Sequence, residues 1–181
     1  MGRMVTCPRC RHRFLVKKSK QNYMPTDDEK KIAPVMFRYE LTTFWHALDI
    51  HINLSGEYAT IGKAVHNETL ESLLIHTRNL FDFFYGPEIP NDDIRAFHFI
   101  EKSVLWRPSK SEYLEEIKPS INKHLTHLTY SRIQGKEWDW KKIALEINEA
   151  YKEFLEALPY EEVGNWKIDG LLHLLTEIKS H

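Results

Sequence analysis

Two cysteines near the start of the chain have the spacing of a zinc-binding half-site. Cys7 and Cys10 enclose Pro8 and Arg9, and His12 follows shortly after. Two thiolates at this spacing can bind one tetrahedral zinc ion, and Cys-Pro-x-Cys is typical of the first half of a zinc ribbon. A closed site needs four ligands, so His12 would be the third and a distant histidine or a second chain would supply the fourth. The alternative is an arm that binds no metal, because a second Cys-x-x-Cys pair is absent.

Histidine is abundant, with 10 in 181 residues, and two histidines occupy one predicted helix. His124 and His127 are three residues apart, a spacing that places both on one helical face. His76 on a neighbouring helix would complete a three-histidine metal site, as in a metal-dependent hydrolase. The zinc hydrolase pattern His-Glu-x-x-His is not present. Separate surface or capped histidines are the interpretation that we favour.

The residues around His127 also have the order of a known family motif. Residues 71–84 read ESLLIHTRNLFDFF, and residues 121–132 read INKHLTHLTYSR. Over about residues 66–132 these segments resemble the HEPN-like helical superfamily, in particular its abortive-infection-type and related uncharacterised bacterial members. In that superfamily the second helix carries an arginine followed after a few residues by a histidine. His127 falls on the motif histidine, and Asn122 stands five residues before it in place of arginine.

The resemblance implies a helical bundle that forms a homodimer and, in active members, cleaves RNA without a metal. Such cleavage needs a base for the ribose 2′-hydroxyl group and a cation for the charge on the phosphate. His127 would be the base. At about 100° per residue, Asn122 lies about 140° from His127 around a helix, whereas Lys123 lies about 40° from it. Lys123 is therefore the better candidate cation, with Arg78 on the neighbouring helix as a substitute.

Charge is distributed unevenly along the chain. Residues 1–20 contain seven of the 25 basic residues and none of the 26 acidic ones, which leaves a balance of −8 for the rest. This basic arm would attract nucleic acid, or it would serve only as a soluble tail. The start has no apolar signal region, and no run approaches the roughly 18 apolar residues of a membrane span. We therefore expect a cytoplasmic protein with reduced thiols and no membrane contact.

Apolar residues at helical spacing predict the elements that would position these groups. Helices are expected from Ile32 to near Gly56, from about Asn67 to Tyr85, from a capping box at Ser109 to near Gly135, and from Trp140 to Leu158. A short helix is expected after residue 91, a last one over residues 171–178, and Pro119 should kink or divide the third. The first helix is expected to be buried through Val35, Met36, Tyr39, Leu41, Phe44, Leu48 and Ile52.

These patterns predict an all-α protein. Residues 32–181 would form a helical bundle of five to six helices, and residues 1–31 would form a basic arm with half a zinc knuckle and a linker. Few glycines and no hairpin dipeptides leave little room for a sheet.

Three functions are consistent with the sequence. The first is a HEPN-like protein of a bacterial defence or toxin–antitoxin system, with RNA or a protein regulator as partner. As an enzyme it would be a metal-independent endoribonuclease and would require no cofactor. The second is a non-enzymatic dimeric module whose basic arm binds nucleic acid or a partner protein, and this arm is the candidate site of a structural zinc ion. The third is a metal-dependent hydrolase that uses His76, His124 and His127.

Overall fold

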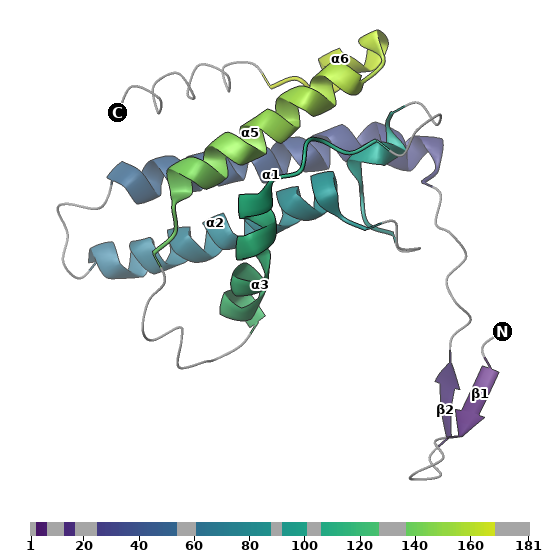
Figure 1. Ribbon diagram of the computed structural model, residues 1–181, viewed down its shortest axis with the longest axis horizontal. Coiled ribbons are helices and arrows are strands. Elements are labelled where there is room, and N and C mark those ends of the chain that lie inside the picture. Colours follow the sequence, from purple (N-terminus) through teal and green to yellow (C-terminus); the bar gives the residue numbers. More distant parts are fainter. Residues whose placement is uncertain are drawn as a thin grey trace.

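The computed structural model describes residues 3–6, 13–16, 25–53, 61–87, 92–100, 106–126 and 137–168. Within these ranges the α-helices are α1 (Asp27–Asn53), α2 (Ile61–Tyr85), α3 (Glu112–Thr126), α5 (Trp140–Ala157) and α6 (Tyr160–Trp166), and the 3-10 helix η1 (Ala96–His98) lies between α2 and α3. Figure 1 shows α1, α2 and α5 as three long helices and the shorter α3 running across them. The predicted all-α bundle is confirmed, and no described helix is long and apolar enough to cross a membrane.

The arm contains a β-hairpin that the sequence patterns do not predict. Strands β1 (Arg3–Thr6) and β2 (Arg13–Val16) pair antiparallel, and Thr6 lies opposite Arg13. Residues 7–12 therefore connect the two neighbouring strand ends. Among the described residues, sheet structure is limited to this hairpin.

Helix α1 begins at Asp27, five residues earlier than the apolar pattern predicts. A capping box explains the earlier start. The Glu29 backbone N–H donates to Thr26 Oγ1 (3.3 Å), and the Thr26 backbone N–H donates to Glu29 Oε2 (2.7 Å). Part of the predicted linker is thus the first turn of α1, because these side chains satisfy backbone donors that the helix end leaves unpaired.

Other element ends also differ from the predicted ones. Helix α2 begins at Ile61 rather than near Asn67, and the short helix after residue 91 is a single 3-10 turn. Helix α3 is capped by Ser111, whose Oγ accepts from the Leu114 backbone N–H (3.0 Å), and not by Ser109. Pro119 lies inside α3 without dividing it. The predicted helix from Trp140 is confirmed as α5.

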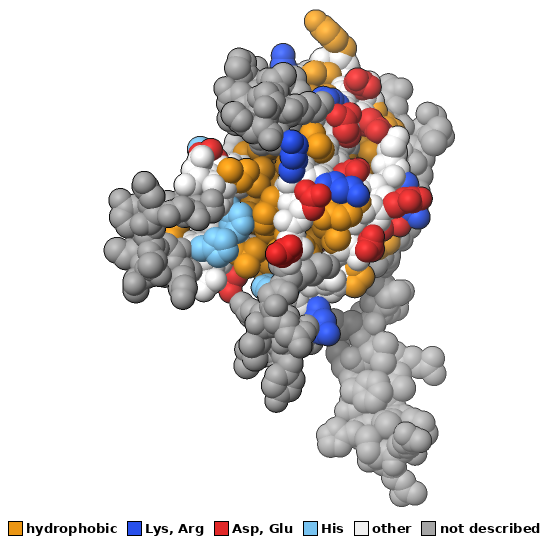
Figure 2. All heavy atoms as spheres, turned by 60° about the vertical axis from the view of Figure 1, so that its left-hand side comes forward, with side chains coloured by type: hydrophobic (Ala, Val, Ile, Leu, Met, Phe, Trp, Pro, Cys, Tyr) orange, Lys and Arg blue, Asp and Glu red, His pale blue; other side chains and the backbone are white. Residues whose placement is uncertain are grey.

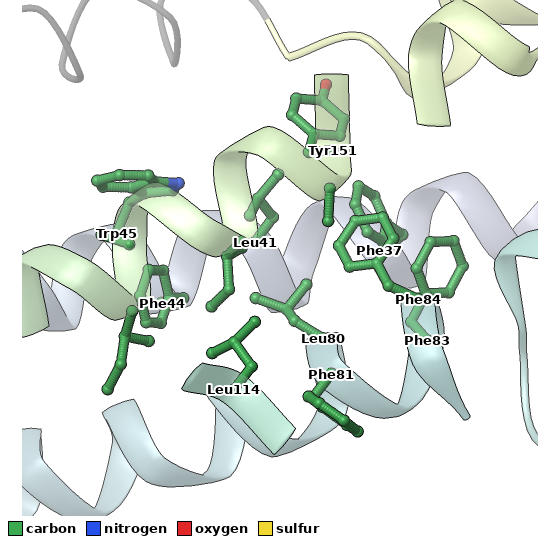
Figure 3. Packing of buried hydrophobic residues seen from close by; sticks show 14 of the residues in the cluster. Phe37, Leu41, Phe44, Trp45, Leu80, Phe81, Phe83, Phe84, Leu114 and Tyr151 are labelled. Atoms are coloured by element: carbon green, nitrogen blue, oxygen red, sulfur yellow. The ribbon is translucent and has the colours of Figure 1, made fainter. Parts of the chain in front are cut away.

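The core lies between α1, α2, α3 and α5. Figure 3 shows part of it, in which Leu41 and Phe44 of α1, Leu80 of α2 and Leu114 of α3 lie in the space between these helices. Toward α6 the core becomes a cluster of aromatic rings around Trp166, which is 1% exposed. Its ring centroid lies 4.6 to 5.8 Å from those of four phenylalanines: Phe37, Phe83, Phe99 and Phe154.

Helix α1 is buried through only part of its predicted apolar face. Leu41, Phe44 and Leu48 are buried as expected. The other four residues of the predicted set are exposed, so this part of the prediction is wrong: Val35, Met36, Tyr39 and Ile52. The exposed residues lie away from the centre of the core, although the Tyr39 ring centroid is still 5.8 Å from that of His76 on α2.

Candidate functional site

A row of five aromatic rings lies at the end of the bundle where α1 and α3 end and α2 and α5 begin. Its ring centroids follow one another from His124 to Trp138 (6.2 Å), Trp140 (6.0 Å), His51 (5.7 Å) and His66 (4.5 Å). Each of these helix ends contributes one ring or lies next to one. Figure 2, which turns this end toward the viewer, shows histidine side chains beside apolar surface. We call this set the ring row.

The ring row combines packing with access to solvent. Trp140 is 9% exposed and anchors the row to the core, whereas His66 is exposed and His51, His124 and Trp138 are half-buried. The His51 and His66 rings are stacked, with 26° between their planes. Partly exposed rings of this kind offer flat faces on which another planar group can stack.

His51 occupies a partly buried position in the row. Burial lowers the pKa of the His51 imidazole below its ordinary value of 6.5, and the neighbouring His66 lowers it further. His51 Nδ1 is buried and has no hydrogen-bond partner among the described residues. The neutral imidazole is therefore the form that fits this position.

This lowered pKa predicts how stability depends on pH. The unfolded chain takes up a proton on His51 at a higher pH than the folded chain does. Neutral His51 therefore contributes its full stability to the folded chain above about pH 6.5, and this contribution is lost as the pH falls. Urea unfolding should show a lower free energy of unfolding at about pH 5.5 than at about pH 7.5. In the His51→Phe variant this difference between the two pH values should be smaller. Burial and the nearby Arg95 also lower the pKa of His98, so His98 accounts for part of the loss of stability that remains in the variant. Exposed His46 on the same helix is the control, and an equal reduction in His46→Gln would contradict the prediction.

A second polar group lies between α1 and α2. His76 Nδ1 lies 2.7 Å from Glu40 Oε2, and Asn79 Nδ2 donates to the same oxygen (3.0 Å). Partial burial alone raises the pKa of Glu40, but the hydrogen bonds from His76 and Asn79 and the charge on His76 outweigh it and hold the pKa below its usual range. His76 is 7% exposed, so this pair joins the two helices and leaves His76 little access to a substrate.

Next to this pair, three basic side chains contact Asp82. Lys118 Nζ lies 2.6 Å from Asp82 Oδ1, and Arg78 Nε lies 3.9 Å from Asp82 Oδ2. The buried Arg95 donates to the Asp82 backbone carbonyl and pairs with Asp93 Oδ2 at 2.5 Å. A cavity of about 320 Å³ lies beside these groups, lined by Arg78, Arg95 and Asp82 among others. Arg78 pairs with Asp82 and Arg95 with Asp93, and Glu40 adds a third carboxylate, so the cavity has no net preference for an anion.

Of the predicted site residues, the structure describes Arg78, Asn122 and Lys123. Arg78 lines the cavity of the Asp82 cluster, whereas Asn122 and Lys123 of α3 do not. Lys123 is exposed in the last turn of α3, next to His124, and Asn122 is half-buried. His127 lies outside the described residues, as do Cys7, Cys10 and His12.

Of the predicted three-histidine metal site, the structure describes His76 and His124 but not His127. His76 is paired with Glu40, and His124 lies against Trp138. Among the residues described, no group of three or more His, Cys, Asp or Glu side chains could hold a metal ion.

Several residues of these sites carry no signal in the sequence. His51 and His66 meet because α1 and α2 are antiparallel, and the Trp138 and Trp140 rings join them only through the packing of α5. Glu40 and Lys118 are each 36 residues from their partner. Of the ring row, the sequence singled out only His124, as part of the histidine pair with His127.

Comparison with known proteins returned no match for this chain, whether to a family model, a curated protein or a solved structure.

Proposed function

We propose that this protein is an RNA-associated helical module that holds unpaired bases on the ring row. The observation that carries the proposal is the continuous contact from His124 through two tryptophans to the stacked pair of His51 and His66. Base stacking on aromatic side chains contributes about 1–3 kcal/mol per base and tolerates any sequence, because every base has a π-face. Single-stranded RNA is the preferred ligand, because bases in a duplex are already stacked on one another.

The basic arm would add the contacts to phosphate. Arg3 and Arg13 lie in the paired strands β1 and β2, within the stretch of seven basic residues that carries no acid. Contacts of this kind are electrostatic and independent of sequence, so binding should weaken as salt rises. The remainder of the chain is acidic overall and would not attract RNA through its net charge. We place such a module, acting as a homodimer or with a protein regulator, in a bacterial defence or toxin–antitoxin system.

Substitution in the ring row tests this function. Titration of a fluorescently labelled, unstructured RNA oligonucleotide should show that His66→Ala or Trp138→Ala weakens binding by about tenfold, the loss expected for one stacked base. Tyr160→Ala is the matched control, because Tyr160 is an aromatic residue of α6 that is 94% exposed and outside the row. Circular dichroism would verify that each variant is folded. Equal affinity of wild type and both row variants would remove the ring row from RNA binding.

A second candidate function is metal-independent cleavage of the bound RNA. It is favoured by the position of Lys123, a cation exposed in the last turn of α3 beside a residue of the ring row. His127, three residues after His124, would be the base, and Lys123 would stabilise the phosphate charge. Arg78 is a weaker candidate because it is paired with Asp82. The same labelled RNA, incubated with a chelator and His127→Ala protein, distinguishes binding from cleavage: products that persist in this variant would exclude His127 as the base.

We further propose that the arm holds a structural zinc ion. The pairing of Thr6 with Arg13 means that the segment with Cys7, Cys10 and His12 joins two adjacent strand ends. Purified protein should therefore contain zinc that the Cys7→Ser, Cys10→Ser variant lacks, as measured by elemental analysis. A site closed within one chain would give about one ion per chain, and a site shared by two copies would give half as much. Wild-type protein that stays zinc-free after incubation with zinc would contradict the proposal.

A further inference from the structure

Two cavities lie side by side along the N-terminal half of α1. Glu29 of α1 lines the first, of about 210 Å³, and Glu40, about three turns further along the helix, lines the second, of about 320 Å³. Asp93 and Ile94, which lead into η1, line both cavities and therefore lie between them. Figure 1 shows the chain around η1 beside this half of α1. We call the two cavities together the acidic groove, which extends along α1 for about 16 Å.

The described residues that line the groove carry more acidic than basic charge. Five carboxylates line it: Glu29, Glu40, Asp82, Asp92 and Asp93. The basic side chains among the described lining residues are Arg78, Arg95 and His98, and both arginines are paired with carboxylates of the groove. Burial, Arg95 and Lys30 lower the pKa of His98, which favours its neutral form. The groove therefore has a net charge of −3, or of −2 when Lys118, which contacts Asp82 from α3, is included.

Exposed apolar side chains lie among these charges. Ile32, Met36 and Ile94 line the groove and are 58%, 49% and 38% exposed. The buried rings of Phe37 and Phe83 line it as well. Apolar surface surrounded by charged side chains is the usual composition of a protein–protein interface, in which the centre is apolar and the rim is polar.

A buried hydrogen-bond donor also belongs to the groove. Arg95 is 6% exposed, and its two terminal nitrogens donate to the Asp82 carbonyl oxygen and to Asp93. Arg95 Nε is buried and has no hydrogen-bond partner among the described residues. A buried donor without an acceptor is unfavourable, and a peptide carbonyl group would supply an acceptor without adding negative charge. An extended peptide has such carbonyl groups available, whereas those of a helix are bonded within the helix.

We propose that the acidic groove binds a short, extended, basic segment of a partner protein. About five extended residues span the 16 Å of the groove. Apolar side chains on every second residue of the segment would contact Ile32, Met36 and Ile94. Lysine or arginine residues between them have side chains long enough to reach the carboxylates at the rim.

Charge and position separate this site from the proposed RNA site. A groove with a net negative charge repels phosphate groups, so a basic protein segment fits it and a nucleic acid does not. The ring row lies at the other end of α1, where His51 stacks on His66. Binding of the partner segment is therefore independent of RNA binding and is measured without RNA.

Fluorescence anisotropy with a labelled synthetic peptide and the full chain tests this site. The peptide has about seven residues, in which lysine and leucine alternate, so that it spans the groove when extended. Ile94→Lys should weaken its binding at least about tenfold, because the substitution removes apolar surface between the two cavities and places a cation beside the lysines of the peptide. Met36→Lys should act in the same direction. Ile75→Lys is the matched control, because Ile75 is 43% exposed on α2 outside the groove, and it should leave the affinity unchanged.

A second peptide, with glutamate in place of lysine, tests the role of charge and should not bind. No binding of the lysine peptide, equal binding of both peptides, or equal affinity of wild type, Ile94→Lys and Met36→Lys would overturn the proposal. Binding that requires the substitutions Arg3→Glu and Arg13→Glu would also overturn it and would assign the groove to the basic arm of the same chain. A dimer that Ile94→Lys dissociates, as measured by sedimentation, would overturn it in favour of a second copy of the chain.

Discussion

Replacing Trp166 with alanine should lower the free energy of unfolding by about 4 kcal/mol, the cost typical of removing a large buried aromatic side chain. Trp166 is 1% exposed and is the largest of the fully buried side chains. Its ring contacts those of Phe37, Phe83 and Phe154, which come from α1, α2 and α5. The substitution therefore opens a cavity where three helices meet.

The backbone around Trp166 increases this cost. Tyr151 Oη donates to the Trp166 carbonyl oxygen (2.9 Å) and accepts from the Ile168 backbone N–H (3.0 Å), so the buried Tyr151 hydroxyl depends on the position of this turn. If the cavity lets the turn shift, a buried hydroxyl loses its partners at a further cost of about 1–3 kcal/mol.

Urea unfolding followed by circular dichroism measures the effect of Trp166→Ala. Tyr160→Ala in the same helix removes an aromatic side chain that is 94% exposed and should change the free energy of unfolding by less than about 0.5 kcal/mol. Similar losses for both variants would show that α6 contributes through its helix alone. A loss confined to Trp166→Ala would show that the aromatic cluster holds α6 on the bundle.

Replacing Gly86 with alanine should lower the free energy of unfolding by about 3 kcal/mol, because there is no space for a Cβ atom. That atom would lie 2.2 Å from the Asp82 carbonyl oxygen and 2.6 Å from the Arg95 guanidinium carbon. Arg95 is 6% exposed and held by the Asp82 carbonyl and by Asp93, so it cannot simply move away. The end of α2 and the segment before η1 would have to separate.

Gly164→Ala is the matched control for Gly86→Ala. Gly164 lies inside α6, and a Cβ atom there would meet nothing within 4 Å. Because alanine favours a helix over glycine by about 1 kcal/mol, Gly164→Ala should be neutral or stabilising. A Gly86→Ala protein as stable as wild type would contradict the close approach of Arg95 to the end of α2.

Helix content and order followed from local patterns. The ends of α2 and α5 were predictable because Gly86-Pro87 stops one helix and Trp140 to Leu158 repeats the apolar period without a break. The start of α1 is also marked in the sequence by the capping box of Thr26 and Glu29, although the apolar pattern begins only at Ile32. The hairpin was not predicted, because β1 and β2 have only four residues each and show no apolar periodicity.

Burial was predictable only where one helix face is apolar. For α5 the periodic residues Ile143, Ile147, Tyr151 and Phe154 are all buried. For α1 the sequence offers two apolar faces, and a single helix gives no reason to prefer either. The packing of α2 against α1 determines which face is buried. Phe37, Leu41 and Phe44 are buried, whereas Val35 and Tyr39 remain exposed to solvent.

By itself, then, the amino-acid sequence determined that this protein is a bundle of helices with a basic arm, because helical periodicity, caps and charge are local properties of the chain. It also determined which residue types were present for chemistry, including the histidines and the cysteine pair. Only the tertiary structure decided which of them meet. His51 stacks on His66, and His124 reaches Trp138, because helix ends distant in sequence come together at one end of the bundle. Contacts of this kind depend on packing between elements, which no spacing within one helix encodes.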